Sequence, residues 1–397
     1  MGLFNRSPAP PPPAPPPPPP PQPLGQRGVA QKKATQPAAH QYPQGSFGIG
    51  VETEFLLEPR RKELNGHTIR EASINAAAAY NAFLLAQGQK SDHPAMHNAI
   101  DQSYRGVKFA EWSLDSDSTI ETPDRNKAPW GLENISPIFR SYENSAWREH
   151  IDTMWRFLTT NYRISANSSC GTHVHLSRAG GFTLDELKRV CQCIIHFEPA
   201  FEGILPRDRL SNEYARSNWL DNPNFGHRNL SRKESIDIIQ NASSMRELVL
   251  LMNPDHDKMF GWNFLYLLNS PYGTIEFRRG AASISSSDVF MWIEIAMSFV
   301  EASIRGGRRE NLAKVPATVG GLKWFIGAAR LPDGVPGLYD SRYLKRLFSN
   351  IPDGAFRQPV PLGKLSPAKL AKLKNKKQED KSKTVILSKM AQEPYWN

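Results

Sequence analysis

Two stretches of the sequence each place a pair of metal-ligand side chains two residues apart. The stretch CGTHVHLS contains His173 and His175, and GVETEF contains Glu52 and Glu54. Successive side chains of an extended strand point to opposite faces, so each pair would share one face and leave apolar neighbours on the other. A half-buried or exposed strand whose polar face meets water shows the same pattern. Each pair alone is therefore consistent with a metal-ligand site and with an ordinary strand.

A third stretch, YGTIEFRRG, alternates in the same way and adds an arginine. Glu276 and Arg278 would share a face with Thr274, and their apolar neighbours would take the other. An acid and an arginine at this spacing form a plain ion pair, or a metal ligand beside a phosphate clamp, since the planar guanidinium matches phosphate oxygens. Glu133, before a Ser-Pro turn, and Asp117, among small hydroxyl residues, are two further candidate carboxylates.

Together the three stretches predict a sheet with one hydrophobic face and one face of carboxylate and imidazole groups. Two neighbouring carboxylates in an apolar strand repel each other, and burial raises that cost unless cations neutralise them. Oxygen-rich sites with one imidazole suit Mg²⁺ or Mn²⁺ better than zinc. Divalent ions beside an arginine are what phosphoryl transfer from a nucleotide requires. The pattern therefore favours a nucleotide and Mg²⁺ (or Mn²⁺) as cofactors.

These strands need helices to bury their apolar face. Apolar residues repeat at spacings of three and four over residues 147–158, which predicts an amphipathic helix. Thr183 and Glu186 have the spacing of a capping box, which predicts the start of a second helix. A third helix should begin near residues 285–290 and stop before Gly306. Strands separated by helices at irregular distances favour an α+β fold over a doubly wound sheet.

The order of five short motifs resembles that of a known enzyme family. The chain carries G-x-E-x-E-F, W-x-x-x-x-D-x-T-I, E-x-x-S-P, C-G-x-H-V-H and T-I-E-F-R in this order. The order is similar to that of the amidoligases, relatives of glutamine synthetase and the glutamate–cysteine ligases. The resemblance implies a curved, mainly antiparallel sheet of the glutamine synthetase catalytic-domain type, with helices packed on one face. It also implies an ATP-dependent carboxylate–amine ligase that forms an amide bond through an acyl phosphate.

The resemblance further implies that four of the motifs supply ligands for two or more Mg²⁺ or Mn²⁺ ions. These ligands are four carboxylates and one imidazole: Glu52, Glu54, Glu133, His173 and Glu276. The sequence departs from the family at Asn134, where an aliphatic residue usually follows the glutamate. Asn134 should face away from the metals, so the departure concerns local packing more than chemistry.

The remaining motif residues receive nucleotide-binding and catalytic roles from the same resemblance. His175 would lie near the nucleotide, and Arg278 would bind and stabilise the transferring γ-phosphoryl group. Such electrostatic stabilisation is usually the largest catalytic effect. Asp117 would position the amine or a metal-bound water. Arg279 should point to the opposite face of its strand and is only a weak candidate for a nucleotide contact.

The positive charge of the chain lies near its ends. Of the formal net charge of +10, residues 1–45 contribute +4 and residues 364–383 contribute +6. The region between them has no excess of positive charge that would indicate a nucleic-acid-binding surface. We expect a disordered, proline-rich basic arm (1–45), an amidoligase-like catalytic domain (46–310), a helical or loop extension of it (311–363) and a lysine-rich mobile tail (364–397).

The arm, the cysteines and the hydropathy indicate partners and location. Thirteen of the 33 prolines fall between Pro8 and Pro23, which is typical of a polyproline II spacer or of a ligand for an SH3- or WW-type partner. Three cysteines without a C-x-x-C pair favour a reducing compartment. No stretch approaches 18 uninterrupted apolar residues, so we expect no membrane span. We expect an intracellular, cytoplasmic enzyme acting on small-molecule or peptide carboxylate and amine substrates.

Two other functions fit part of the pattern. A metal-dependent hydrolase would use His173, His175 and a glutamate, but it would need neither Arg278 nor the Glu-x-Glu pair. A non-catalytic interaction module of the same fold would give its buried carboxylates no compensating cations. Stretches 61–70 and 221–235 offer basic side chains that would hold an acidic substrate or remain solvated surface.

Overall fold

A computed structural model describes the chain from the end of the predicted arm into the lysine-rich C-terminal segment. The described residues are 42–90, 92–268, 273–363 and 365–376. All of them fall in one compact unit. The polyproline run predicted to bind an SH3- or WW-type partner and the last part of the predicted lysine-rich tail lie outside these residues.

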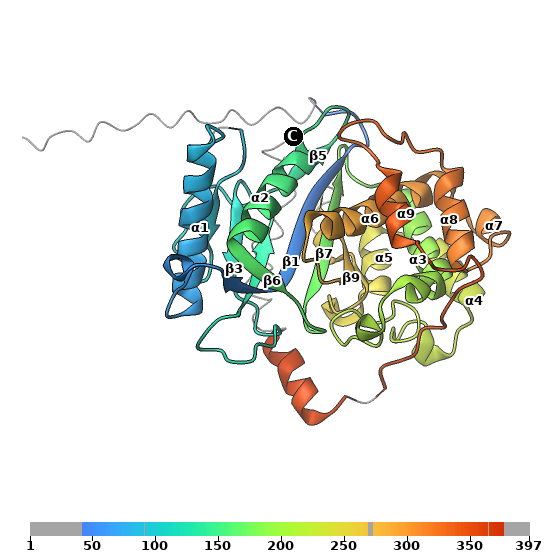
Figure 1. Cartoon of the computed structure of the whole chain (residues 1–397). Helices are drawn as coiled ribbons and strands as arrows, with labels where there is room; N and C mark the ends of the chain where they lie inside the picture. Colours follow the sequence, from blue (N-terminus) through green and yellow to red (C-terminus); the bar gives the residue numbers. More distant parts are fainter. Residues whose placement is uncertain (1–41, 91, 269–272, 364, 377–397) are drawn as a thin grey trace, which may run out of the picture. The chain divides into compact units, whose positions relative to one another are not determined.

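Within the described residues, the strands form a nine-stranded sheet around the long strand β1 (Phe47–Pro59). Strand β4 (Trp130–Ile135) lies on one side of β1, β7 (Gly171–Arg178) lies on the other, and β9 (Ile275–Ala281) pairs with β7. All three pairs are antiparallel, and Figure 1 shows β1 and β7 side by side. The prediction of an α+β fold with a mainly antiparallel sheet is therefore confirmed.

Five shorter strands complete the sheet. β3 (Trp112–Asp115) pairs with β4, and β8 (Trp262–Asn263) pairs with β9. β5 (Phe139–Ser141) and β6 (Tyr162–Ser165) pair with opposite ends of β1. β2 (Met96–Asn98) runs parallel to β3. Because β3 lies next to β4, the carboxylate of Asp115, the last residue of β3, comes close to the predicted site.

Four helices cover the apolar face of the sheet: α1 (Ile69–Ala86), α2 (Trp147–Asn161), α3 (Leu184–Ile204) and α6 (Ser286–Gly306). The ring of Trp155 in α2 packs edge-on against Phe55 of β1, with centroids 5.8 Å apart. The rings of Phe201 in α3 and Trp292 in α6 lie 5.9 and 6.2 Å from that of Phe277 in β9. The alternation of the strands therefore leaves their polar face away from these helices.

The three helices predicted from the sequence are present. The capping box of Thr183 and Glu186 opens α3 with both of its reciprocal hydrogen bonds. Cys191 and Cys193 are fully buried in α3, and each is a free thiol, as small apolar residues of a core helix should be. Helix α6 ends at Gly306, one residue later than the sequence predicted.

Shorter helices build the rest of the described unit: α4 (Arg232–Asn241), α5 (Met245–Met252), α7 (Arg309–Leu312), α8 (Val319–Ala328) and α9 (Ser341–Leu347). Short 3₁₀ helices cover Lys62–Leu64, Arg207–Arg209, Gly226–Arg228, Pro254–His256 and Leu265–Leu267. Helices α8 and α9 pack against α6, so residues 311–363 join the same core. Among the described residues, none of the helices has the length and hydrophobicity that crossing a bilayer requires.

The segment predicted as a mobile lysine-rich tail begins differently. Residues 367–376 form a helix, which we call the C-terminal helix. Its lysines pair with carboxylates of earlier segments: Lys369 with Glu213, Lys372 with Glu121 and Lys376 with Asp117. The sequence shows a run of lysines but not the acidic partners, which lie more than 150 positions away. The described part of the predicted tail is therefore helical and contacts the rest of the compact unit, and its mobility stays a prediction.

Candidate active site

Strand register brings the predicted ligands together on one face of the sheet. Three directly opposed pairs carry them: Glu52 with His173, Glu54 with Glu133, and His175 with Glu276. Opposed residues of an antiparallel pair point to the same face with their Cβ atoms about 5 Å apart. The predicted sheet with one hydrophobic face and one carboxylate and imidazole face is therefore present.

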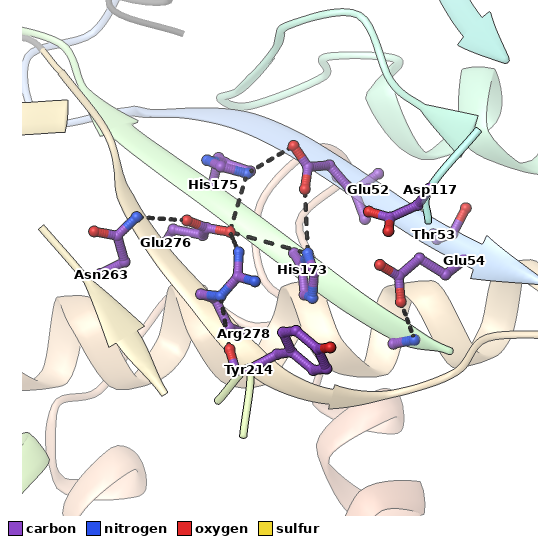
Figure 2. A network of polar contacts seen from close by, with 12 residues as sticks. Glu52, Thr53, Glu54, Asp117, His173, His175, Tyr214, Asn263, Glu276 and Arg278 are labelled. Atoms are coloured by element: carbon purple, nitrogen blue, oxygen red, sulfur yellow. Dashed lines mark hydrogen bonds and ion pairs between the residues drawn. The ribbon is translucent and has the colours of Figure 1, made fainter. Parts of the chain in front are cut away.

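The first cluster joins two carboxylates to both histidines (Figure 2). Glu52 lies 3.2 Å from Nδ1 of His173 through one oxygen and 3.2 Å from Nε2 of His175 through the other. Oε1 of Glu276 lies 3.9 Å from His173 Nδ1 and 3.7 Å from His175 Nε2. Ligand atoms of Glu52, His173 and Glu276 all lie within 4.8 Å of one another. Three such atoms are close enough for one divalent ion to contact all of them.

A second cluster shares His173 with two buried carboxylates. Ligand atoms of Glu54, Glu133 and His173 also lie within 4.8 Å of one another. Glu54 accepts a 2.7 Å hydrogen bond from the backbone N–H of Gly171. Burial raises the pKa of Glu54. These mainly oxygen donors, costly to bury without a cation, fit Mg²⁺ or Mn²⁺.

Neighbouring positive groups keep the first cluster ionised. Burial alone would raise the pKa of Glu276, but Arg278 and His175 outweigh it and lower the pKa to about 2. Burial acts against ionisation of Glu52 as well, yet His175 and His173 hold its pKa well below the ordinary value. Both carboxylates therefore carry negative charge at neutral pH, as ligands of a divalent ion must.

Arg278 is fixed beside this cluster from two directions. Its Nη1 donates to Oε1 of Glu276, and its Nε donates to the backbone carbonyl of Tyr214 at 3.2 Å. Asn263 donates a 2.7 Å hydrogen bond to the other oxygen of Glu276, which holds that carboxylate in place. The guanidinium is buried and oriented before any substrate arrives, which is the condition for strong electrostatic stabilisation.

Both clusters open onto one cavity of about 790 Å³. Seven of the predicted site residues line it: Glu52, Glu54, Asp117, Glu133, His173, Glu276 and Arg278. A cavity of this size accommodates a ligand in the range typical of small-molecule and cofactor sites. The polar face of the sheet therefore forms the wall of a binding site.

The region that forms this site matches a known protein family. A family model described as "Putative amidoligase enzyme" matches residues 46–300. The chain belongs to the amidoligase family. The matched region contains all five sequence motifs and every ligand of both clusters, so the resemblance drawn from those motifs is confirmed. The C-terminal helix lies beyond the matched region. A search of curated proteins found no match.

In this amidoligase His175 lies beside two of the predicted metal ligands. The side chain is buried and is not among the described residues that line the cavity. It contacts Glu52 and Glu276, and its Nδ1 lies 3.4 Å from the hydroxyl of Thr274. Burial lowers the pKa of His175, but the two carboxylates outweigh it and raise the pKa. These contacts orient two of the predicted ligands, and the place of His175 near a nucleotide stays a prediction.

Arg279 of the amidoligase lies on the face of β9 that faces the helices. Strand alternation turns this residue to that side, as the sequence indicated, and there its guanidinium pairs with Glu202 and lies 3.6 Å from Glu198 of α3. Arg279 is not among the described lining residues of the cavity. Its contacts are those of a buried structural ion pair, and its weak assignment to the nucleotide stays a prediction.

Asp117 also lines the cavity and lies beside Glu54 in Figure 2. Its Oδ1 accepts hydrogen bonds from the backbone N–H and the hydroxyl of Thr119, both at 2.7 Å. Its Oδ2 accepts from the ammonium group of Lys376. Burial would raise the pKa of Asp117, but Lys376 outweighs it and holds the pKa below the ordinary value.

Several lining residues were not predicted. Asp115 lies directly opposite Glu133, and its place two residues before Asp117 in the same strand-like stretch was the signal for it. Arg209 donates to the carbonyls of Cys170 and Arg278 at 3.2 Å, and so ties β7 to β9 beside the cavity.

The basic side chains at the cavity come from other segments than the two suggested from the sequence. Besides Arg209, Arg278 and Lys376, the described lining includes Arg105, Lys108, Arg125 and Lys258. Of stretches 61–70 and 221–235, only Ile69 is among the described lining residues. Loop contacts of this kind depend on the path of the chain, which local sequence patterns do not reveal.

Proposed function

We propose that this amidoligase is an ATP-dependent carboxylate–amine ligase that works through an acyl phosphate with two or more Mg²⁺ or Mn²⁺ ions. One observation carries the proposal: two ligand groups share His173 on the wall of the cavity that also holds the preorganised Arg278. Family membership independently supports a ligase. The proposal includes a catalytic domain over residues 46–310 and a fold of the glutamine synthetase type.

The chain's residues divide the work in this proposal. Glu52, His173 and Glu276 would hold one ion, and Glu54 and Glu133 would hold another beside it, since the neutral imidazole of His173 can ligate only one ion at a time. Bound ions would neutralise the charge of the triphosphate. Arg278 would donate hydrogen bonds to the γ-phosphoryl group, in an orientation that Glu276 and the Tyr214 carbonyl already fix.

The proposed reaction has two steps, phosphorylation of the carboxylate and formation of the amide. The substrate carboxylate attacks the γ-phosphorus of ATP, so that an acyl phosphate forms and ADP leaves. The deprotonated amine then attacks the acyl carbon, and the new C–N bond forms as the C–O bond to phosphate breaks. The basic side chains at the cavity, among them Arg105 and Arg125, support binding of the anionic substrates.

The alternatives fit the site less well. A metal-dependent hydrolase gives no reason to hold a buried arginine against a metal-ligand carboxylate, as Arg278 is held against Glu276. A non-catalytic interaction module gives no reason to bury the carboxylates of Glu54 and Glu133 beside each other. Each alternative therefore leaves one of the site's costly features unexplained.

Hydroxylamine provides a test of the acyl phosphate. We expect the protein, MgATP, hydroxylamine and a panel of amino-acid and γ-glutamyl carboxylates to yield hydroxamate and ADP in equal amounts with at least one acid. With that acid labelled by ¹⁸O, one labelled oxygen should appear in the released phosphate, measured by ³¹P NMR. ADP release that depends on the acid but leaves the label out of the phosphate would contradict the mechanism. Amide hydrolysis without ATP would favour the hydrolase instead.

A further inference from the structure

The C-terminal helix inserts a lysine into the proposed active site. Lys376 and Asp117 both line the cavity, and their side chains are only 9% and 2% exposed. The charge of Lys376 also acts on Glu54 of the second cluster. Most lysines keep their ammonium group in water, because burial of an unpaired charge is costly. The buried ammonium group of Lys376 is therefore a specific feature of this site.

Asp117 has the form of a prepared ammonium site. Thr119 holds Oδ1 through its backbone N–H and its hydroxyl, which fixes the plane of the carboxylate. Oδ2 then points to the ammonium group of Lys376. Since Thr119 and Asp117 belong to the catalytic region and Lys376 to a later helix, the anionic half of the pair is present without the lysine.

The two other ion pairs of the C-terminal helix are weak. Lys369 lies 3.2 Å from Glu213 and Lys372 lies 3.0 Å from Glu121, but these two lysines are 52% and 62% exposed. Exposed ion pairs of this kind contribute little to stability. The helix is therefore held mainly by the buried side chain of Leu373 and by the contact of Lys376 with Asp117, and a competing cation at Asp117 would remove the second of these contacts.

We infer that Asp117 is the subsite for a primary alkylammonium group and that Lys376 occupies it from within the chain as an autoinhibitory substitute for the amine substrate. A ligand of this class has an ammonium group on an unbranched aliphatic chain, as a lysine side chain has. That the bound amine is a substrate rests on the proposed function, whereas the ammonium subsite itself rests on the contacts of Asp117. An incoming amine displaces Lys376 from Asp117.

Chemical rescue tests the subsite without ATP. Lys376→Ala should lower the midpoint of thermal unfolding, and n-butylammonium at about 10 mM should restore it by several degrees, because a ligand that binds the folded state stabilises it. The same shift should be absent in wild type, in Lys374→Ala, which changes an exposed lysine of the same helix, and in Lys376→Ala/Asp117→Asn. n-Butyltrimethylammonium, which has the charge but no N–H donor, should rescue much less.

Equal shifts with both ammonium compounds, or in all four proteins, would overturn the subsite. If Lys376→Ala does not fold, Lys376→Met keeps the aliphatic stem and replaces it in the same assay. In amide synthesis, removal of Lys376 should lower KM for an alkylamine about 10-fold with little change in kcat. A collapse of kcat would overturn autoinhibition, because it would make Lys376 a catalytic group. If n-butylammonium restores the unfolding midpoint but the protein binds no MgATP, the ammonium subsite is supported and the proposed ligase function is contradicted.

Discussion

Arg278→Lys is expected to lower kcat for ATP-dependent amide synthesis by about 100-fold or more, because loss of one preorganised donor at a developing charge has an effect of this size. Lysine keeps the charge but cannot reproduce the planar fork that now contacts Glu276 and the carbonyl of Tyr214. Steady-state ADP release measures kcat, and calorimetry measures MgATP affinity, which should change only a few-fold.

The adjacent arginine provides a matched control for this prediction. Arg279→Lys makes the same substitution one residue away, on the face of β9 that pairs with Glu202 and Glu198. This variant should unfold at a lower temperature but keep kcat per folded molecule. Equal losses of kcat in both variants would mean that Arg278 acts through the stability of β9 and not on the phosphoryl group.

His173→Ala is expected to remove one high-affinity Mn²⁺ site, because His173 belongs to both ligand groups and its neutral imidazole has one lone-pair nitrogen for one ion. We expect wild type to bind two Mn²⁺ ions and His173→Ala to bind one of them at least about 100-fold more weakly, a larger loss than removal of an outer-sphere partner causes. Titration of free Mn²⁺ by electron paramagnetic resonance gives both the number of sites and their affinities.

Two further variants separate the sites. Glu276→Gln removes a ligand of the first group and Glu133→Gln removes one of the second, so each variant should keep one Mn²⁺ ion. Circular dichroism should show that all three variants retain their fold. Two intact Mn²⁺ sites in His173→Ala would contradict the assignment of His173 as a metal ligand.

The strands and their polar faces were predictable because a strand places residues at i and i+2 on one face whatever its partners are. That rule was sufficient for Glu52 and Glu54, for His173 and His175, and for the opposite directions of Arg278 and Arg279. The alternation also predicted that these strands share one sheet, but not their order β4-β1-β7-β9, since strand order depends on contacts between distant segments.

The sequence did not reveal how deeply a side chain is buried or which distant residue it contacts. His175 shares a face with His173 but lies behind Glu52 and Glu276, and alternation cannot distinguish a residue at the cavity wall from one beneath it. The lysine run was interpreted as solvated because charge runs usually are. Its burial at Lys376 requires Asp117, which is 259 positions away.

The most direct test of the central claim is calorimetric titration of the protein with ATP in the presence of Mg²⁺, for wild type and for Glu52→Gln/Glu54→Gln. The account predicts binding by the wild type that is lost without a divalent ion and that weakens at least about 100-fold, or about 2.7 kcal/mol, in the double variant. Absence of nucleotide binding by the wild type with either Mg²⁺ or Mn²⁺ would contradict the ligase, and an interaction module of the same fold would take its place.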